Sequence, residues 1–164
     1  MGFFAKSKDT DLTIHAPFEG TVIPMSEVPD PVFAGGMLGA GVAIRPSTDA
    51  DEFTVHAPVT GRVSNIFHGG HAFALVTKLG TQVLVHVGLD TVELKGAGFT
   101  ALVEEGAKVK AGDPIMTVHA KVIREAGKDL VTPIVGTDKS QVSGAEVTAG
   151  PATQGAAIAT FSLV

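Results

Sequence analysis

The stretch Thr13–Val22, TIHAPFEGTV, returns 41 residues later as Thr54–Val63, TVHAPVTGRV. Each copy has an apolar run, an Ala-Pro pair, a turn residue, a glycine and a second apolar run. Proline cannot donate to a strand ladder and glycine tolerates positive φ, so each copy should form a sharp corner between two strands. Two such corners indicate a duplicated β motif folded about a pseudo-twofold axis.

A third segment, Val103–Ile115, has turn–strand–turn chemistry and leads into an expected strand that ends at Val118. Corners and turns of this kind recur in biotinyl and lipoyl carrier domains. The predicted fold class is therefore all-β, a flattened antiparallel β-sandwich or barrel of the duplicated barrel-sandwich-hybrid type. Short helical turns are expected over 99–105 and 119–126, and Gly127 should stop the second.

Length and composition predict one domain with tails. The chain has 164 residues, enough for a sizeable core. We expect a flexible N-terminal tail over 1–11, a folded domain over 12–138 and a loosely ordered C-terminal extension over 139–164, which is rich in Ala, Gly, Ser and Thr. The first segment lacks the apolar run of a signal peptide, and the uncharged stretch 147–164 is too polar to span a bilayer. A cytoplasmic location is expected.

Several classes of function are disfavoured. The chain has no cysteine, which excludes disulfides, thiolate catalysis and iron–sulfur clusters. Its net charge of −5 argues against binding to nucleic acid, which requires a basic face. Phosphate-loop, nucleophile-elbow and zinc-protease motifs are missing from the sequence, so no cofactor is expected.

The clearest predicted hairpin joins His71–Lys78 to Thr81–Val87 across Leu79-Gly80. If the connection is a two-residue turn, Phe73 faces His86, and His71 lies diagonal to His86 on one face of the sheet. A slip of one residue would put the two histidines on opposite faces, so their proximity depends on the register.

Two imidazoles side by side allow three kinds of site: a structural hydrogen bond, a phosphoryl-accepting pair or a metal site. Structural zinc requires four ligands and catalytic zinc three, so a metal is expected at most as a weak site shared by His71, His86 and a partner's carboxylate. A neutral imidazole nucleophile needs only a second imidazole to hold the phosphate oxygens. Corner packing or solvent exposure explains the other four histidines: His15, His56, His68 and His119.

Asp30 and Asp90 lie in the sequence beside apolar residues that look exposed. An apolar patch rimmed by carboxylates suits the docking of a basic protein. The alternative is that the two aspartates cap turns while the apolar residues pack in the core.

Several distinctive blocks follow one another along the sequence: Ala16–Gly20, Val28–Phe33, Gly39–Pro46, Ala57–Gly61, His71–Phe73, Val85–Phe99 and Gly106–Pro114. In this order they resemble one known family, the glucose-class enzyme IIA component of the bacterial phosphoenolpyruvate-dependent sugar phosphotransferase system. The resemblance runs from about Ile14 to Val135.

The resemblance implies a phosphotransferase component with a phosphohistidine intermediate. It places His86 as the phosphorylated nucleophile and His71 as the group that stabilises the phosphate. The donor would be the histidine phosphocarrier protein and the acceptor a cysteine on the IIB domain of a sugar permease, with Asp30 and Asp90 meeting arginines on both partners. The apolar docking rim would consist of Val32, Phe33, Phe67, Leu84 and Val92. One departure is Gly69, which stands where many members carry a threonine.

Two alternatives stay open. The corners also suit a biotinyl or lipoyl carrier module, for which Lys78 is the nearest candidate for modification, although it lacks the usual flanking residues. The other is a regulatory protein that binds transporters or metabolic enzymes through the face around His86, with phosphorylation as the switch. Membrane association would be peripheral, through a permease or through the N-terminal tail, which resembles that of free-standing members.

Overall fold

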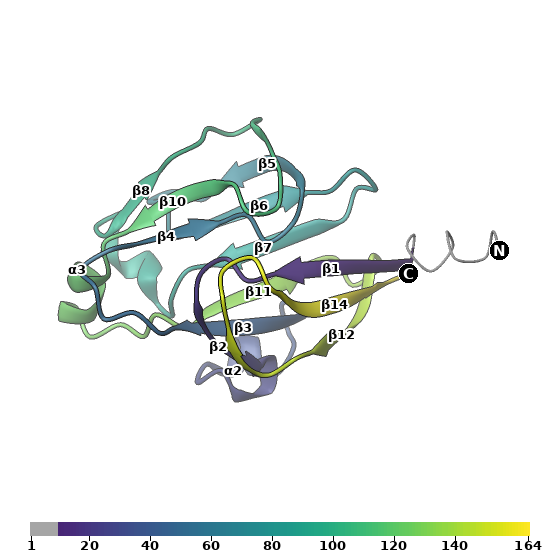
Figure 1. The fold of residues 1–164 in the computed structure, drawn as a ribbon, viewed down its shortest axis with the longest axis horizontal. Coiled ribbons are helices and arrows are strands. Elements are labelled where there is room, and N and C mark those ends of the chain that lie inside the picture. The colour runs from purple at the N-terminus through teal and green to yellow at the C-terminus, as the bar shows by residue number, and fades with distance from the viewer. Residues whose placement is uncertain (1–9) are drawn as a thin grey trace.

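A computed structural model describes residues 10–164 as three antiparallel β-sheets with four short helical segments (Figure 1). The first half of the chain contains β1 Asp11–His15, β2 Gly20–Pro24, β3 Ala40–Pro46, β4 Phe53–His56, β5 Gly61–Ile66, β6 Ala72–Val76 and β7 Gln82–His86. The second half contains β8 Phe99–Ala101, β9 Lys108–Val109, β10 Pro114–Val118, β11 Thr132–Gly136, β12 Val142–Val147, β13 Gly150–Ala152 and β14 Ala157–Leu163. The helical segments are η1 Met25–Glu27, α2 Pro31–Ala34, η2 Thr91–Leu94 and α3 Ala120–Glu125.

The strand order shows the predicted duplication. The eight-stranded sheet runs β13-β2-β3-β11-β7-β6-β5-β9, and the two smaller sheets run β1-β14-β12 and β4-β10-β8. A pseudo-twofold axis between β11 and β7 exchanges the two smaller sheets and the two halves of the large one. Because the large sheet begins at β13 and ends at β9, the described strands form an open sandwich and not a closed barrel. The predicted all-β class is confirmed.

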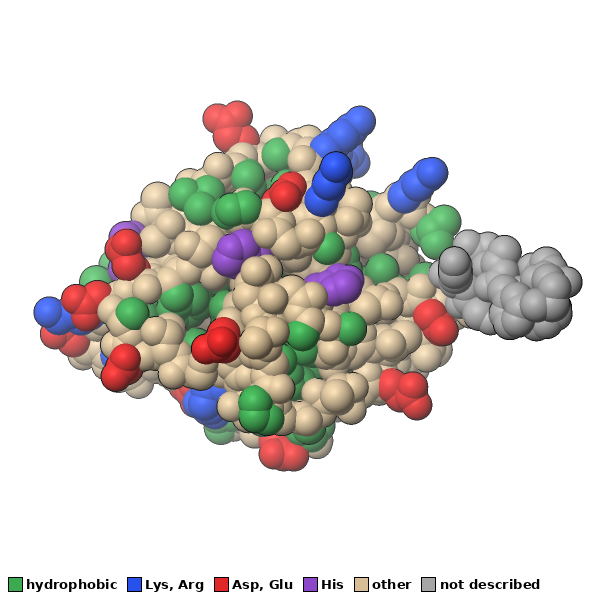
Figure 2. Space-filling view, viewed as in Figure 1, with side chains coloured by type: hydrophobic (Ala, Val, Ile, Leu, Met, Phe, Trp, Pro, Cys, Tyr) green, Lys and Arg blue, Asp and Glu red, His purple; other side chains and the backbone are tan. Residues whose placement is uncertain are grey.

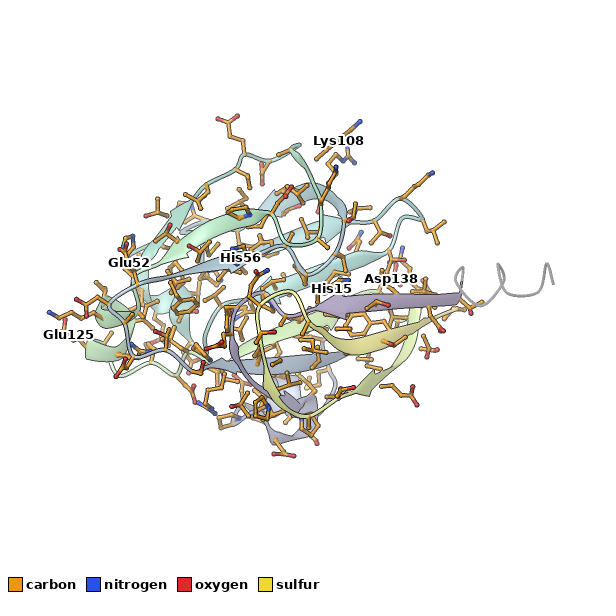
Figure 3. All side chains as sticks on the ribbon, in the orientation of Figure 1. His15, Glu52, His56, Lys108, Glu125 and Asp138 are labelled. Carbon is orange, nitrogen blue, oxygen red and sulfur yellow. The ribbon has the colours of Figure 1, made fainter. Side chains whose placement is uncertain are left out.

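The two repeat corners are joined by reciprocal backbone hydrogen bonds. The backbone N–H of His15 donates to Pro58 O at 2.9 Å, and the N–H of His56 donates to Pro17 O at 2.8 Å. The ring of His56 also contacts Pro17 O through Nδ1, at 3.0 Å. Figure 3 shows His15 and His56 near one another at the centre of the molecule. Corner packing therefore accounts for both histidines, as predicted.

The C-terminal segment differs from the loosely ordered extension predicted over 139–164. Three strands lie there, and β14 is placed between β1 and β12. The segment is the symmetry mate of residues around β9 and β10: Gly155 N–H donates to Ala16 O just as Gly112 N–H donates to Ala57 O, both at 2.9 Å. The first corner therefore needs it, and a boundary at Asp138 would divide one folded unit.

The core lies between the sheets and draws on both halves of the chain. Its largest fully buried side chains include Phe73, Phe161, Ile14, Ile44 and Ile115. Phe161 comes from β14, so the C-terminal strand supplies core as well as backbone pairing. The predicted N-terminal tail over 1–11 falls almost wholly outside the described residues, and Asp11 already belongs to β1.

The central hairpin has a register one residue away from the predicted one. Ala72, not Phe73, lies opposite His86. The connection is longer than the predicted two-residue turn, because the N–H of Thr77 pairs with Thr81 O and Gly80 adopts a φ of 88° between them. Positive φ at a glycine is typical of three-residue hairpin loops.

The two predicted helical turns have different outcomes. The helix expected over 119–126 is confirmed as α3, and Gly127 follows it with a φ of 77°. The turn expected over 99–105 is wrong, because β8 lies there and pairs with β10. Phe99 and Thr100 favour strands, and pairing with Val118 and Thr117 outweighs the weak helical pattern. Within residues 10–164, no helix has the length and apolar character that crossing a bilayer requires.

Candidate functional site

His86 lies at the end of β7, on the outer face of the large sheet, and is half-buried. Its Nδ1 lies 2.7 Å from Gly88 O. A carbonyl oxygen can only accept, so Nδ1 carries the proton and donates it. The neutral ring therefore keeps its lone pair on Nε2.

The turn that presents Gly88 O requires glycine. Gly88 has a φ of 79°, and a Cβ there would lie 2.6 Å from Thr91 Cγ2 and 2.9 Å from Asp129 O. The buried Thr91 hydroxyl donates to Val87 O at 2.6 Å and fixes the same turn. This role of Thr91 is not predicted by any motif in the sequence, although Thr91 lies only five residues after His86.

His71 lies beside His86, as predicted. The two ring centroids are 5.1 Å apart and the planes meet at 72°. The register alone would have separated them, since Ala72 occupies the position opposite His86. The alternation of side chains between the two faces of a strand does not apply to His71, because His71 lies just before β6. It follows Gly69 and Gly70, which have φ values of 93° and 83°.

The left-handed backbone at Gly69 also bears on the threonine that the resemblance would place there. A Cβ at Gly69 would lie 3.0 Å from the backbone nitrogen of Gly96. A branched side chain would therefore need the loop to move. In this chain the backbone of His68 interacts with the His71 ring, an interaction that by itself raises the pKa of His71.

Two aromatic rings flank the histidine pair. Phe33 lies 5.3 Å from the His86 ring, and Phe67 lies 6.4 Å from the His71 ring. Phe33 is only 6% exposed, whereas Phe67 is 41% exposed. Phe33 thus packs under the nucleophile candidate instead of forming part of an exposed rim, which differs from the sequence-based expectation.

The other predicted rim residues surround the pair to different degrees. Val32 and Val92 are exposed and Leu84 is half-buried. Asp30 caps α2, because its Oδ1 accepts from Val32 N–H at 2.9 Å. Asp90 is exposed, has a φ of 56° and makes no side-chain cap of η2. Both carboxylates act electrostatically on His86, so Asp30 combines the capping and charge roles that the sequence left as alternatives.

Burial lowers the pKa of both histidines. For His86, burial outweighs the hydrogen bond to Gly88 and the charges of Asp30 and Asp90, all of which raise its pKa. For His71, burial and then the charge of His86 lower the pKa, against the hydrogen bond to His68. Both rings are therefore neutral at pH 7, and His86 presents an unprotonated Nε2.

Little in the described part of the chain supports a metal centre. Among residues 10–164 there is no group of three or more His, Cys, Asp or Glu side chains placed to hold a metal ion. His15 and His119 make structural contacts. His15 Nδ1 lies 3.0 Å from Gly155 O, and His119 bridges Thr100 Oγ1 and Glu52 Oε2 at 2.9 and 3.2 Å.

Comparison with known proteins identifies the family. Residues 12–142 match the family model described as phosphoenolpyruvate-dependent sugar phosphotransferase system, EIIA 1. The chain belongs to this family. It is a glucose-class EIIA phosphocarrier, a phosphotransferase component that works through a phosphohistidine intermediate. The resemblance found in the sequence is thereby confirmed.

The EIIA relatives cover most of the chain. The PTS system glucose-specific EIIA components of Bacillus cereus and Bacillus anthracis are each 46% identical to it, over 89% and 88% of this chain and 86% and 85% of theirs. A Corynebacterium glutamicum PTS system mannose-specific EIIBCA component is 51% identical over 74% of this chain and 17% of its own length. The solved structure of glucose permease IIA from Mycoplasma capricolum superposes with a TM-score of 0.81 at 38% identity, covering 92% of this chain and 95% of that one.

Proposed function

We propose that His86 accepts a phosphoryl group on Nε2 from the histidine phosphocarrier protein and passes it to a cysteine of a sugar-permease IIB domain. The observation that carries this proposal is the 2.7 Å contact of Nδ1 with Gly88 O, which directs the lone pair to Nε2, away from the turn. The C. glutamicum relative, named an EIIBCA component, combines B, C and A parts in one protein and supports a IIB domain as the acceptor. We propose a cytoplasmic location, where such partners would meet the chain.

Phosphoryl transfer requires mainly that the protein position the reacting groups and stabilise charge. In the accepting step Nε2 attacks phosphorus in line, the P–N bond to the donor imidazole breaks, and a new P–N bond forms on His86. The ring then carries positive charge, which the hydrogen bond from Nδ1–H to Gly88 O stabilises. In the donating step the thiolate of the partner attacks the same phosphorus, and the neutral His86 ring leaves.

His71 is proposed to hold the phosphate oxygens during both steps. The centroids of the His71 and His86 rings are 5.1 Å apart, and His71 is only 7% exposed to solvent. A neutral His71 ring has one N–H, and the negative charge of an approaching phosphate favours a second proton on the ring, so a donor can face the equatorial oxygens without having to reorganise. Backbone N–H groups at Gly69 and Gly88 are proposed as further donors.

The surface around the pair suits a basic partner. Val32, Phe67 and Val92 expose apolar side chains, and Asp30 and Asp90 add negative charge beside them. An apolar centre with an acidic rim favours arginine-bearing partners and speeds their encounter at low ionic strength. We propose this surface as the docking site for both the donor and the acceptor.

The proposed function is tested by rebuilding the relay from purified components. With phosphoenolpyruvate, enzyme I and the histidine phosphocarrier protein present, intact mass spectrometry should show one added phosphoryl group that is labile to acid. Leaving out the phosphocarrier protein should prevent the gain. Phosphorylation without it, or no gain with an active phosphocarrier control, would contradict the proposed donor.

Replacing His71 with glutamine should slow transfer without removing the nucleophile. His71→Gln keeps an N–H donor on a shorter side chain, so we expect phosphorylated His86 to form at a rate reduced about tenfold or more, which corresponds to the loss of one charge-assisted hydrogen bond. Quench-flow measurement of both the accepting and the donating step gives the rates. The matched control is His68→Gln at an exposed histidine nearby. Unchanged rates in both directions would remove His71 from the mechanism.

A further inference from the structure

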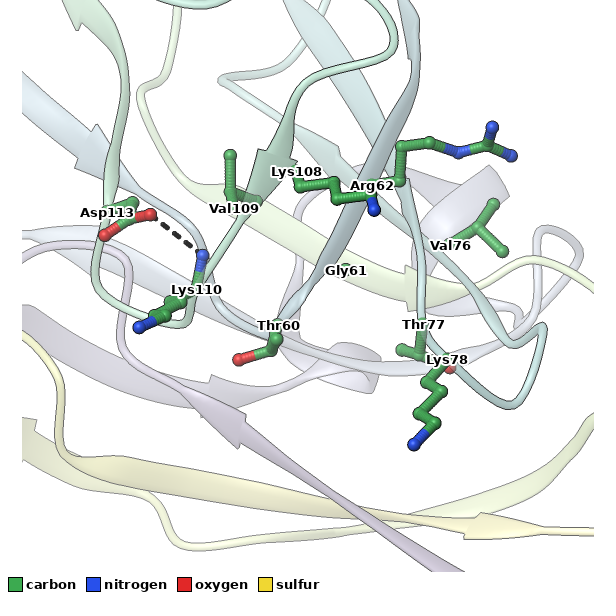
Figure 4. Close-up of a pocket in the computed structure, with 10 residues that line it drawn as sticks. All are labelled: Thr60, Gly61, Arg62, Val76, Thr77, Lys78, Lys108, Val109, Lys110 and Asp113. Carbon is green, nitrogen blue, oxygen red and sulfur yellow. Dashed lines mark hydrogen bonds between the residues drawn. The ribbon is translucent and has the colours of Figure 1, made fainter.

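A second concave site lies at the β9 edge of the large sheet. Strands β5 and β9, together with the turn after β6, line a groove of about 840 Å³ (Figure 4). It is separate from the histidine pair: Val76, in its lining, is four residues along β6 from Ala72, the partner of His86, or about 13 Å along the strand. Neither the phosphorylation chemistry nor its docking surface uses it.

Four cations line this groove on a chain whose net charge is −5: Arg62, Lys78, Lys108 and Lys110. Figure 2 shows the corresponding gathering of Lys and Arg side chains at the upper right of the molecule, around Lys108 as labelled in Figure 3. The one acidic residue in the lining, Asp113, holds its own turn instead, because its Oδ2 accepts from the backbone N–H of Lys110 at 2.8 Å. Within residues 10–164, the ion pairs involve Arg45, His119 and Lys128, and none of the four groove cations.

The pairing of β5 with β9 gains no stability from this charge. Arg62 on β5 lies directly opposite Lys108 on β9, and like charges in a cross-strand pair destabilise a sheet. Lysine on a short edge strand protects against edge-to-edge aggregation, which gives Lys108 one structural use. That explanation does not extend to Arg62, which lies on the paired strand β5, or to Lys78 in a turn.

The pseudo-twofold axis supplies an internal comparison. The same groove exists in the other half of the molecule, at about 300 Å³, between β2 and β13. Strand pairing places Thr21 at the position of Arg62 and Pro151 at that of Lys108. Arg45, which lies opposite Thr21 on β3, forms an ion pair with Asp129 at 2.6 Å. The fold therefore builds the groove twice, and only one copy carries unpaired positive charge.

We propose that the groove of Arg62, Lys78, Lys108 and Lys110 binds a small organic polyanion bearing at least two phosphate or carboxylate groups. The cations come from three separate segments, so they can meet anionic groups at different ends of one ligand (Figure 4). Val76 and Val109 give the groove apolar surface suited to a carbon scaffold. The volume lies within the range of small-molecule sites.

Fructose 1,6-bisphosphate is a suitable probe, because it carries two phosphates on a short scaffold. Calorimetric titration of the whole chain at low ionic strength should give saturable binding, and amide NMR shifts should centre on Gly61, Val76 and Val109. In Arg62→Gln/Lys108→Gln, affinity should fall at least tenfold, about the effect of losing one charge-assisted contact. The matched control is Lys121→Gln/Lys139→Gln, which removes the same charge from exposed sites elsewhere and should leave affinity unchanged.

Other outcomes would overturn the proposal. No saturation up to about 10 mM probe, or equal weakening in the two double variants, would mean that the groove attracts anions only through general charge. Inorganic phosphate binding as tightly as the bisphosphate would remove the requirement for two anionic groups. Binding to phosphatidylglycerol vesicles without binding to the bisphosphate would indicate a membrane surface. A lower melting temperature in Arg62→Gln/Lys108→Gln would make the cations structural, whereas relief of their repulsion should maintain or raise it.

Discussion

We expect His86→Ala to accept no phosphoryl group while it keeps the fold. The substitution removes Nε2 of His86, the proposed nucleophile, which the contact of Nδ1 with Gly88 O leaves unprotonated. Intact mass after incubation with phosphoenolpyruvate, enzyme I and the phosphocarrier protein provides the measurement. The expected result is complete loss of the acid-labile mass gain.

The fold should survive this substitution because His86 contributes little to the core. It lies half-buried on the outer face of β7, and its ring makes one hydrogen bond to backbone, whose loss costs about 1 kcal/mol. Urea unfolding should therefore remain cooperative. His68→Ala is the matched control and should be phosphorylated normally. Phosphorylation of His86→Ala to the wild-type level would show that another residue carries the phosphoryl group.

The second large effect is on stability. A chain ended at Asp138 should fail to fold, because β1 loses its partner β14 and the first repeat corner loses its backbone bonds to Gly155 and Ala156. The hydrophobic core would also lose Phe161, which is fully buried in the same cluster as Ile14 and Ile44. Circular dichroism and urea titration should show no cooperative transition.

A single substitution in β14 tests the contribution of the C-terminal strands to stability without removing them. Phe161→Ala deletes a fully buried ring and should lower the free energy of unfolding by about 3–5 kcal/mol. Val164→Ala, at a residue that is 82% exposed, should change it little. If the shortened chain unfolds cooperatively and still accepts a phosphoryl group, the C-terminal strands are an accessory to the fold.

The repeat corners could be predicted from sequence because proline and glycine impose local geometry. Thr13–Val22 and Thr54–Val63 carry the same pattern, and the structure joins them as that pattern implies. The matching C-terminal turn could not be predicted in the same way. Its residues Gly155-Ala156-Ala157-Ile158 lack the aspartate and proline of the symmetry-related segment Gly112-Asp113-Pro114-Ile115. Small residues at those positions resemble a tail when they are read alone, and only pairing with β1 and β12 orders them.

At the site, the pairing of two histidines was predictable but its cause was not. Strand alternation in the observed register would have placed His71 on the wrong face, and the φ values of Gly69 and Gly70 correct this. A sequence does not specify which of several permitted φ values a glycine adopts. The burial of Phe33 beneath His86 likewise depends on how α2 packs on the sheet, which is a tertiary property.

The pairing of β1 with β14 also constrains how the molecule assembles. Asp11 lies opposite Ser162, so contacts that close the fold join the two ends of the described chain (Figure 1). Such distant pairings carry a large loop-closure entropy, and β proteins built on them fold in about milliseconds to seconds. During synthesis β1 must wait, with its apolar face uncovered, until β14 has left the ribosome. The first strand of the described residues is therefore among the last to find its partner.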